Sequence, residues 1–453
     1  MASTYIYRNN DATAGGGYSS TWTWSAWVKR GTLGEQGLFM NRRIDHVSNS
    51  RMRFQFSSSD NLFIETKDST SNDNNYMETK MKFRDTNAWY HIVLAFDTTL
   101  SSTTDMIKIW INNKSIETEL GGWNSPDRAS NGFGTLWSSA TRSMLGIATN
   151  NSNTDFMFDG SMSHIHFTYG TAYTPSAFGE TDSSTGEWKI KTSPSVTYGS
   201  QGFFVLKDGN SATDQSGQSN NMTIDGGTLT KTKDCPSNVF ATLNPLVRHT
   251  GTVANGNTRY GTSSSSWIGI PATLGNLTGK WYWEYKLTTG AEWSQCGIVS
   301  QAGYNGLLTS YVGGITNGVA MNTGQGDIYT AGGSAQAWFG SARSQGQIIS
   351  VALDCDNNKI YWGTNGVWGN SSNPATGSNG YSIPSALNTD KPYFPAFSVH
   401  NCTIDINFGN GTFGTTGITT NSGNGYAGTD GKSIFNYQPP TGYSALNTKG
   451  LNL

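Results

Sequence analysis

The stretch that decides the fold is GKWYWEYKL, residues 279–287, which places four aromatic rings within five positions. Its odd positions are all apolar: Trp281, Trp283, Tyr285 and Leu287. Successive side chains of a β-strand point to opposite faces, so this set shares one face. Burying each large ring contributes about 2 to 3 kcal/mol, which favours a core strand over an exposed platform for stacking sugars. Only Tyr282 of the four rings is then expected at the surface.

The composition indicates an all-β protein. Aromatic residues make up 12% of the 453 residues and charged residues 13%, with 55 Gly against 12 Pro. This balance suits short strands joined by many turns. A net charge of −2 argues against a nucleic-acid partner. The sequence contains neither an apolar run long enough to insert into a membrane nor the basic and apolar segments of a signal peptide, so we expect a chain made in the cytoplasm.

The cysteines give no sign of a metal or disulfide framework. All four lie in the second half of the chain, without CxxC or tight Cys/His spacing: Cys235, Cys296, Cys355 and Cys402. Zinc sites and disulfide scaffolds both require closer or more regular spacing. We therefore expect four reduced thiols.

The two halves of the chain differ in charge. Residues 1–232 hold 41 charged side chains, whereas residues 233–453 hold 19. The stretch 214–238 between them is polar and Gly-rich, and after Leu229 it shows no strand-like alternation, as is typical of a domain boundary. The sequence therefore predicts two domains, 1–232 and 233–453.

Period-two alternation recurs in the first half. Two apolar sets alternate with polar sets, namely Trp22, Trp24, Ala26 and Val28 with Thr21, Thr23 and Ser25, and Met52, Phe54 and Phe56 with Arg51, Arg53 and Gln55. Each predicts a strand with one buried and one wet face. The nearly continuous apolar run 88–96 predicts a central strand covered on both faces, and 106–111 predicts the next strand. Such strands, about ten residues apart, predict a two-sheet sandwich.

The order of these segments, followed by FDGSMSHIHFTYGTAYTPSAFGE (158–180), resembles laminin-G-like or concanavalin-type jelly rolls. The segments YTPSAFGETDSSTGEWKIK (173–191), GSQGFFVLKD (199–208) and DQSGQSNNM (214–222) resemble the closing part of laminin-G-like modules in structural proteins of phages, especially marine phages. The resemblance covers about residues 1–230.

The second half resembles a SPRY domain over about residues 240–410. The matching segments are GKWYWEYKL, QCGIVS (295–300), QIISVALDCDNNKIYWGTNGVWG (347–369) and YFPAFSV (393–399). Asp356-Asn357-Asn358 and Asn365-Gly366 tolerate positive φ, so they predict two hairpins. Gln345-Gly346-Gln347 departs from the Gly-Asp pair that is usual in the family. The predicted fold is therefore all-β, with two antiparallel jelly-roll sandwiches in tandem.

The terminal segments of this half also resemble those of phage SPRY proteins. SNVFATLNPL (237–246) and PPTGYSALNTKGL (439–451) each carry an aromatic residue, then two intervening residues, then Leu-Asn. We expect the two segments to lie close together on the domain surface.

The sequence contains only weak candidates for a catalytic or metal site. Glu180 and Glu187 are the nearest approach to the paired carboxylates of a glycoside hydrolase, but the residues between them read as a turn. His164 and His166 would share one strand face, for which ordinary sheet hydrogen bonding is the favoured explanation. We predict no enzyme.

Calcium is the one metal that the first domain suggests. Laminin-G-like modules often hold it with Asp side chains on a sheet rim, and Asp97 and Asp105 flank the turn between two central strands. Asp is also common in turns for backbone capping alone, which we favour. No cofactor or metal site is therefore predicted.

Aromatic residues in polar loops are the candidate ligand contacts. They are Trp293, Tyr304, Tyr311, Trp338, Phe339 and Trp368. Similarity to SPRY domains implies a ligand face built from inter-strand loops, where rings beside amides suit a neutral sugar or a peptide. Each ring alone is more typical of an anchor packed on the sandwich edge.

The resemblances imply a phage virion protein, homo-oligomeric and in contact with other virion proteins. On a tail fibre or tail it would recognise a host-surface glycan or protein through its loops. The alternatives are a capsid decoration or tail architectural protein and, with least support, a glycoside hydrolase.

Overall fold

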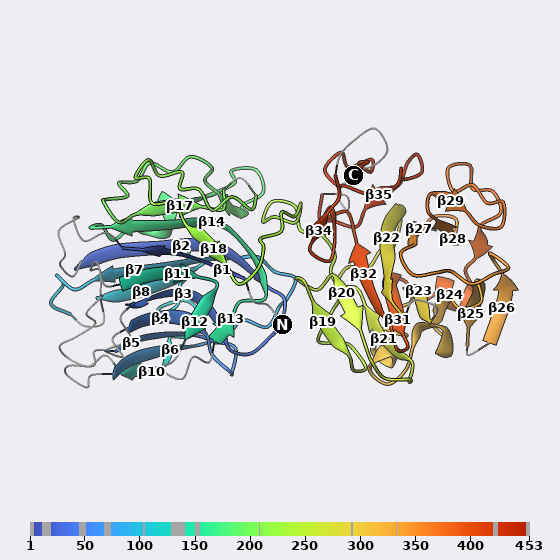
Figure 1. The fold of residues 1–453 in the computed structure, drawn as a ribbon, viewed down its shortest axis with the longest axis horizontal. Helices are drawn as coiled ribbons and strands as arrows, with labels where there is room; N and C mark the ends of the chain where they lie inside the picture. The colour runs from blue at the N-terminus through green and yellow to red at the C-terminus, as the bar shows by residue number, and fades with distance from the viewer. Residues whose placement is uncertain are drawn as a thin grey trace. The chain divides into compact units, whose positions relative to one another are not determined.

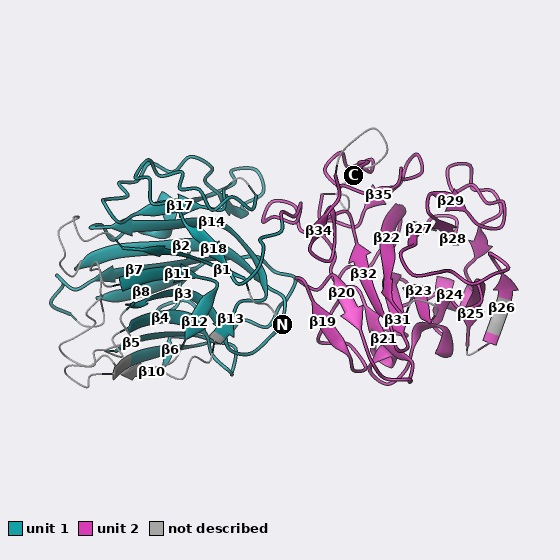
Figure 2. Ribbon diagram, in the orientation of Figure 1, with its two compact units in different colours: residues 1–230 teal, residues 231–453 magenta. Residues whose placement is uncertain are grey.

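The computed structural model is built almost entirely of β-strands, which confirms the predicted all-β class (Figure 1). It describes residues 4–10, 20–44, 51–67, 74–102, 105–127, 141–149, 155–207, 209–290, 293–331, 333–419 and 425–449. The chain forms two compact units, Met1–Thr230 and Lys231–Leu453 (Figure 2), whereas the sequence places the division at Lys233. Within the described residues, no helix has the length and apolar character needed to cross a membrane.

Two antiparallel sheets form the first unit. The larger has eight strands in the order β10-β6-β5-β4-β3-β11-β1-β18, and the other has six in the order β17-β14-β2-β7-β8-β9. The strands of the larger sheet are β1 (Tyr5–Asn9), β3 (Gln36–Arg43), β4 (Arg51–Phe56), β5 (Asn61–Lys67), β6 (Asn74–Lys82), β10 (Trp123–Asp127), β11 (Thr141–Leu145) and β18 (Thr223–Asp225). Those of the other sheet are β2 (Thr21–Arg30), β7 (Tyr90–Asp97), β8 (Ile107–Ile111), β9 (Lys114–Ser115), β14 (Gly160–Tyr169) and β17 (Phe203–Val205). Shorter elements are β12 (Ile147–Thr149), β13 (Asp155–Met157), η1 (Pro175–Ala177), β15 (Gly179–Thr181) and β16 (Trp188–Ile190).

The core of the first unit lies between these sheets, where the alternating apolar sets predict it. Trp24 on β2 stacks on Phe39 of the facing sheet with ring centroids 6.2 Å apart, and Trp22 stacks on Phe96 at 5.1 Å. The strand β7 is buried along nearly its whole length, as its continuous apolar sequence predicts. Interdigitated rings from both sheets therefore hold the sandwich together.

The polar faces of two strands are not wet, in contrast to the sequence prediction. Thr23 and Ser25 are fully buried because the segment after β14 covers them, and the Tyr173 amide donates to Thr23 Oγ1 at 2.7 Å. On β4, Gln55 is also buried, and its amide donates to Glu35 at 2.8 Å. Alternation identified the core face correctly, but local sequence carries no signal of a distant segment that covers the other face.

The second unit is also a two-sheet sandwich. One sheet has the order β19-β20-β32-β22-β27-β28-β29, with β30 and β35 added at β28 and β22, and the other has the order β21-β31-β23-β24-β25-β26. The strands of the first are β19 (Thr252–Ala254), β20 (Arg259–Gly261), β22 (Lys280–Thr289), β27 (Ile348–Asp354), β28 (Lys359–Thr364), β29 (Val367–Trp368), β30 (Tyr381–Ser382), β32 (Thr403–Asn407) and β35 (Ser444–Ala445). Those of the second are β21 (Ile268–Pro271), β23 (Ser294–Val299), β24 (Gly318–Asn322), β25 (Asp327–Thr330), β26 (Gly333–Ala337) and β31 (Phe394–Val399). Short elements are η2 (Tyr304–Leu308), η3 (Val312–Gly314), α1 (Ser385–Asn388), β33 (Thr412–Phe413) and β34 (Thr416–Gly417).

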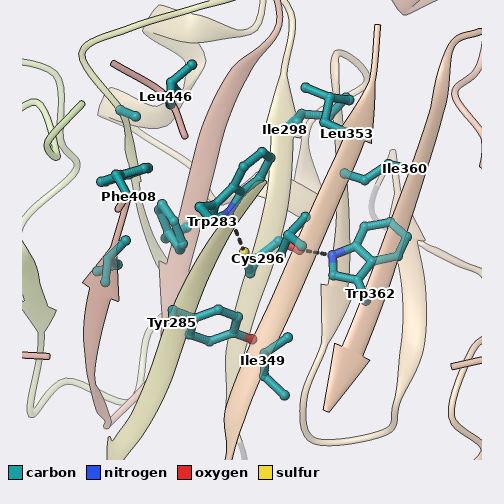
Figure 3. Close-up of a cluster of buried hydrophobic side chains, with 14 of the residues drawn as sticks. Trp283, Tyr285, Cys296, Ile298, Ile349, Leu353, Ile360, Trp362, Phe408 and Leu446 are labelled. Carbon is teal, nitrogen blue, oxygen red and sulfur yellow. Dashed lines mark hydrogen bonds between the residues drawn. The ribbon is translucent and has the colours of Figure 1, made fainter. Parts of the chain in front are cut away.

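The rings of β22 form the centre of the second core, which confirms the prediction from GKWYWEYKL. Trp283 and Tyr285 are fully buried and Trp281 is 5% exposed. Figure 3 shows Trp283 beside Cys296 of the facing sheet, and the indole N–H lies 3.5 Å from the Cys296 sulfur. The indole of Trp362 donates to the Cys296 carbonyl at 2.8 Å. All four cysteines are free thiols.

Tyr282, which the sequence places at the surface, is fully buried. The C-terminal segment crosses the outer face of β22, where Phe435 meets the Tyr282 ring at 4.8 Å. The neighbouring Glu284 is also fully buried and accepts hydrogen bonds from the backbone amides of Asn436 and Tyr437, both at 2.8 Å. The period-two pattern is correct, but β22 is covered on both faces.

The predicted hairpins and the predicted pairing of the terminal segments are both present. Asn358, Asn365 and Gly366 have positive φ, as the turns require. The Ala241 amide donates to the Leu446 carbonyl at 2.8 Å, so the two Leu-Asn segments lie together. Both residues are buried, and the contact is therefore part of the domain interior rather than its surface.

Candidate functional site

All six strands of the sheet β21-β31-β23-β24-β25-β26 have one end at a common edge of that sheet. Pairing of Val399 with both Ile268 and Ser294 aligns the start of β21, the end of β31 and the start of β23. Further pairs align the end of β24 with the start of β25 and the end of β26. We call this edge, with the loop residues that adjoin it, the rim. Because loops at one end of a sandwich are free to vary, a rim is the usual place for recognition.

A strip of four rings crosses the rim. Trp267 precedes β21, His400 follows β31 and Trp293 precedes β23, so the register places them side by side. The His400 ring lies 5.5 Å from that of Trp267 and 5.6 Å from that of Trp293. Tyr311 extends the strip by stacking on Trp267 at 5.5 Å. We call these four residues the aromatic strip.

The aromatic strip is partly open to solvent. Trp293 is 47% exposed, whereas the other three rings are half-buried. The four serines 263–266 before Trp267 are exposed, as is Asn401 after His400. His400 Nδ1 is buried and has no hydrogen-bond partner among the described residues. Rings bordered by hydroxyl and amide groups can pack against a flat apolar surface while hydrogen-bonding its polar edge.

Three of the predicted site residues lie beyond the far end of the strip. Trp338 is buried, packs edge-on against Trp362 at 5.4 Å and donates to its carbonyl at 2.9 Å, so it belongs to the core. Phe339 and Trp368 are half-buried against the same core. A side chain at Gly369 would collide with Trp338 and Phe339, which shows how closely this loop packs.

Tyr304 lies at the opposite end of the sheet. Its hydroxyl donates to the Ala272 carbonyl at 2.9 Å, accepts from Asn244 at 2.9 Å, and its ring packs on Phe394 at 4.4 Å. These contacts make Tyr304 an anchor of the η2 turn. The structure thus brings Trp293 and Tyr311 together through two unpredicted rings, and it separates Tyr304 from them.

In the first unit, a buried Ser–His contact has the wrong polarity for catalysis. The Trp188 indole N–H donates to His91 Nδ1 at 2.9 Å, so the neutral imidazole carries its proton on Nε2 and donates it to Ser25 Oγ, also 2.9 Å away. A general base must instead accept the serine proton. Burial, with a smaller effect of His164, lowers the pKa of His91 to about 3.

The predicted histidine pair is structural. Ile165 and Phe167 face the core, as expected, and His166 is buried on the other side, with its Nδ1 2.9 Å from the Tyr198 hydroxyl. A register shift before His166 and the positive φ of His164 bring both imidazoles to Phe204. Burial lowers the pKa of His166 well below its usual value.

The carboxylates considered for hydrolysis and calcium have local partners. The residues between Glu180 and Glu187 form a turn, and Glu180 lies 3.5 Å from Lys189. Asp97 accepts from the Thr99 amide at 3.0 Å, and Asp105 accepts from Lys108 at 2.8 Å. The described residues contain no group of three or more His, Cys, Asp or Glu side chains that could hold a metal ion.

Comparison with known proteins supports the fold of the first unit. Residues 3–175 match the Concanavalin A-like lectin/glucanases superfamily. The first unit thus has a concanavalin A-like lectin fold. A search of curated proteins finds no match.

Solved structures similar to this chain include SPRY domains. One is the SPRY domain of human HERC1, at 16% identity, which covers 36% of this chain and 96% of that domain with a TM-score of 0.28. Another is a human SPRY domain at 17% identity, which covers 33% of this chain and 90% of that domain with a TM-score of 0.26.

Sequence reasoning missed three residues of the rim. Trp267 follows a run of four serines and meets the same criterion as the predicted rings, so it was detectable. His400 ends an apolar strand and acquires its neighbours only through strand pairing. Arg343 is one of few cations in the charge-poor second half, but only the folded structure shows that no described acidic side chain pairs with it.

Proposed function

We propose that this chain is a virion structural protein of a bacteriophage tail or tail fibre that binds a host-surface glycan through the rim of its second unit. The observation that carries the binding part is the aromatic strip, with Trp293 47% exposed beside hydroxyl-rich loops. A large ring left in solvent forfeits burial energy in the free protein and regains it when a ligand covers it. The virion part is supported by the resemblance of the sequence to phage proteins.

The binding proposal is tested with purified full-length protein on a glycan array. We expect selective binding by the unchanged chain, and Trp293→Ala should weaken it about tenfold or more, because loss of a central ring contact typically costs over 1 kcal/mol. Trp267→Ala should weaken it too. Leu277→Ala is the matched control, since Leu277 is 59% exposed but lies near the opposite end, beside the Asn276–Tyr393 bridge. Equal binding by Trp293→Ala and the unchanged chain refutes the proposed site.

A second candidate is an architectural role, in which this unit packs on another virion protein. It is favoured by three exposed leucines near the end opposite the rim: Leu246 at 50%, Leu277 at 59% and Leu308 at 43% exposed. Exposed apolar groups that share a region mark contact surfaces more often than scattered ones do. Cryo-EM of the virion discriminates the two roles, because burial of the aromatic strip against a neighbour supports assembly alone, whereas a solvent-facing rim supports recognition.

A further inference from the structure

Arg343, at the rim, carries a charge that no acidic side chain neutralises among the described residues. Its Nη2 donates to the carbonyl and Oγ of Ser341, at 3.1 and 2.6 Å. Its guanidinium lies over Phe339, with Cζ 4.6 Å from the ring centroid. Nε is buried without a hydrogen-bond partner, and Nη1 likewise has no partner within the described part of the chain. The cation is thus oriented by its neighbours but not neutralised.

Two other desolvated arginines of this protein are paired with carboxylates. Arg30 lies 3.1 Å from Asp60. Arg259 forms a two-point contact with Asp405, at 2.6 and 2.7 Å. Removing a charge from water is costly unless a partner compensates it, which is why partly buried cations normally have a counter-ion. Partial burial lowers the pKa of Arg343.

Backbone hydrogen bonds connect Arg343 to the aromatic strip. The Arg343 amide donates to the Thr323 carbonyl at 2.7 Å, and the Thr323 amide donates to the Ser294 carbonyl at 2.9 Å. Ser294 directly follows Trp293. The connection therefore spans two steps of strand-like spacing, about 10 Å. A ligand of a few linked sugar rings is long enough to reach both residues.

We propose that Arg343 is an anion subsite of the rim, which binds the carboxylate or sulfate group of an acidic glycan whose sugar rings pack on Trp293. This inference rests on the proposed glycan-binding function. The guanidinium matches both groups because its N–H donors lie in one plane and its charge shortens and strengthens each hydrogen bond. Phe339 and Ser341 hold that plane before the ligand arrives, so little side-chain freedom is lost on binding.

The test is an array of acidic microbial polysaccharide fragments, each printed beside its carboxyl-reduced or desulfated form. The full chain is assayed at constant ionic strength so that general charge effects do not differ between probes. We expect the acidic member of at least one pair to bind about 10- to 100-fold more tightly, as for hydrogen bonds to a charged group. Arg343→Gln should remove this preference and leave binding of the neutral member within about twofold, and thermal unfolding checks that the variant is folded.

Two control variants and the paired acidic and neutral glycans distinguish the possible outcomes. Arg343→Lys should retain part of the preference, and Lys432→Gln, which removes an exposed charge elsewhere, should retain all of it. Preference confined to carboxyl-reduced pairs identifies a uronic-type acid, and preference confined to desulfated pairs identifies a sulfate ester. Binding without any acidic preference, or a preference that survives Arg343→Gln, overturns this inference and leaves the proposed function standing. No binding to any glycan overturns both.

Discussion

Replacing Glu284 with Gln tests whether one buried carboxylate makes the stability of the second unit depend on pH. Burial raises the pKa of Glu284 to about 7, although hydrogen bonds from Asn436, Tyr437, Tyr282 and Asn407 act in the opposite direction. The difference between about 7 and the ordinary value of 4.5 corresponds to about 3 kcal/mol. This amount is a large fraction of the stability of a typical domain.

The sign follows from the direction of this difference. Because the folded-state pKa is raised, the favourable contribution of Glu284 is complete below the unfolded-state pKa and is lost as pH rises through about 7. From about pH 4.5 to pH 9 the unchanged protein should therefore lose about 3 kcal/mol from this group. Glu284→Gln has no such loss, because an amide does not titrate. Its cost, about 1 to 3 kcal/mol for one backbone amide left without an acceptor, should be the same at every pH.

Urea unfolding of the full chain, followed by tryptophan fluorescence, measures this difference. The transition of the second unit is the one that a core variant, Ile406→Ala, shifts to lower urea. The unfolding free energy of the unchanged protein minus that of Glu284→Gln should fall by about 3 kcal/mol from pH 4.5 to pH 9. Glu187→Gln, at an exposed glutamate, should show no such change. A difference that stays constant across this range refutes the assignment of the pH dependence to Glu284.

Three further perturbations test the packing. Trp283→Ala should lower the unfolding free energy of the second unit by about 3 to 5 kcal/mol in urea titrations, because it empties the centre of the core. Trp188→Phe removes the donor to His91 Nδ1 and should lower the unfolding free energy of the first unit by about 1 to 3 kcal/mol. In the unchanged protein, ¹⁵N NMR should show that the His91 imidazole stays neutral down to about pH 4. Gly37→Ala should destabilise the first unit by more than about 1 kcal/mol, because a Cβ there would lie 2.0 Å from the Ala148 amide nitrogen. The control is Gly333→Ala, whose Cβ would meet no atom within 4 Å, so that the calorimetric melting temperature should stay nearly unchanged.

The strands could be predicted because the alternation of apolar and polar residues along each one shows which of its faces is buried. Trp22 and Trp24 alternate with small polar residues, and Trp283 and Tyr285 alternate with Tyr282 and Glu284, so one face of each strand was correctly placed in a core. The turns could also be predicted from local sequence, since Asn tolerates the positive φ found at Asn358 and Asn365. The sequence of a strand does not show which distant segment of the chain covers its second face.

This same limit explains the mixed outcome at the rim. A polar neighbourhood identifies a loop, but Trp338 and Trp293 both sit in such neighbourhoods, and only one remains exposed. The difference arises because Trp338 packs over the buried Trp362, whereas the one described ring in contact with Trp293 is that of the half-buried His400.

Strand register decides the contact between Trp293 and His400, which lie more than a hundred positions apart in the sequence and meet where β23 begins and β31 ends. Register is set by the whole sandwich, through the matching of its buried faces. A recognition surface made of strand ends is thus a property of the assembled fold. For that reason the test that separates Trp293 from Trp338 is ligand binding by the folded chain: Trp293→Ala should lose binding while keeping stability, and Trp338→Ala should lose stability first.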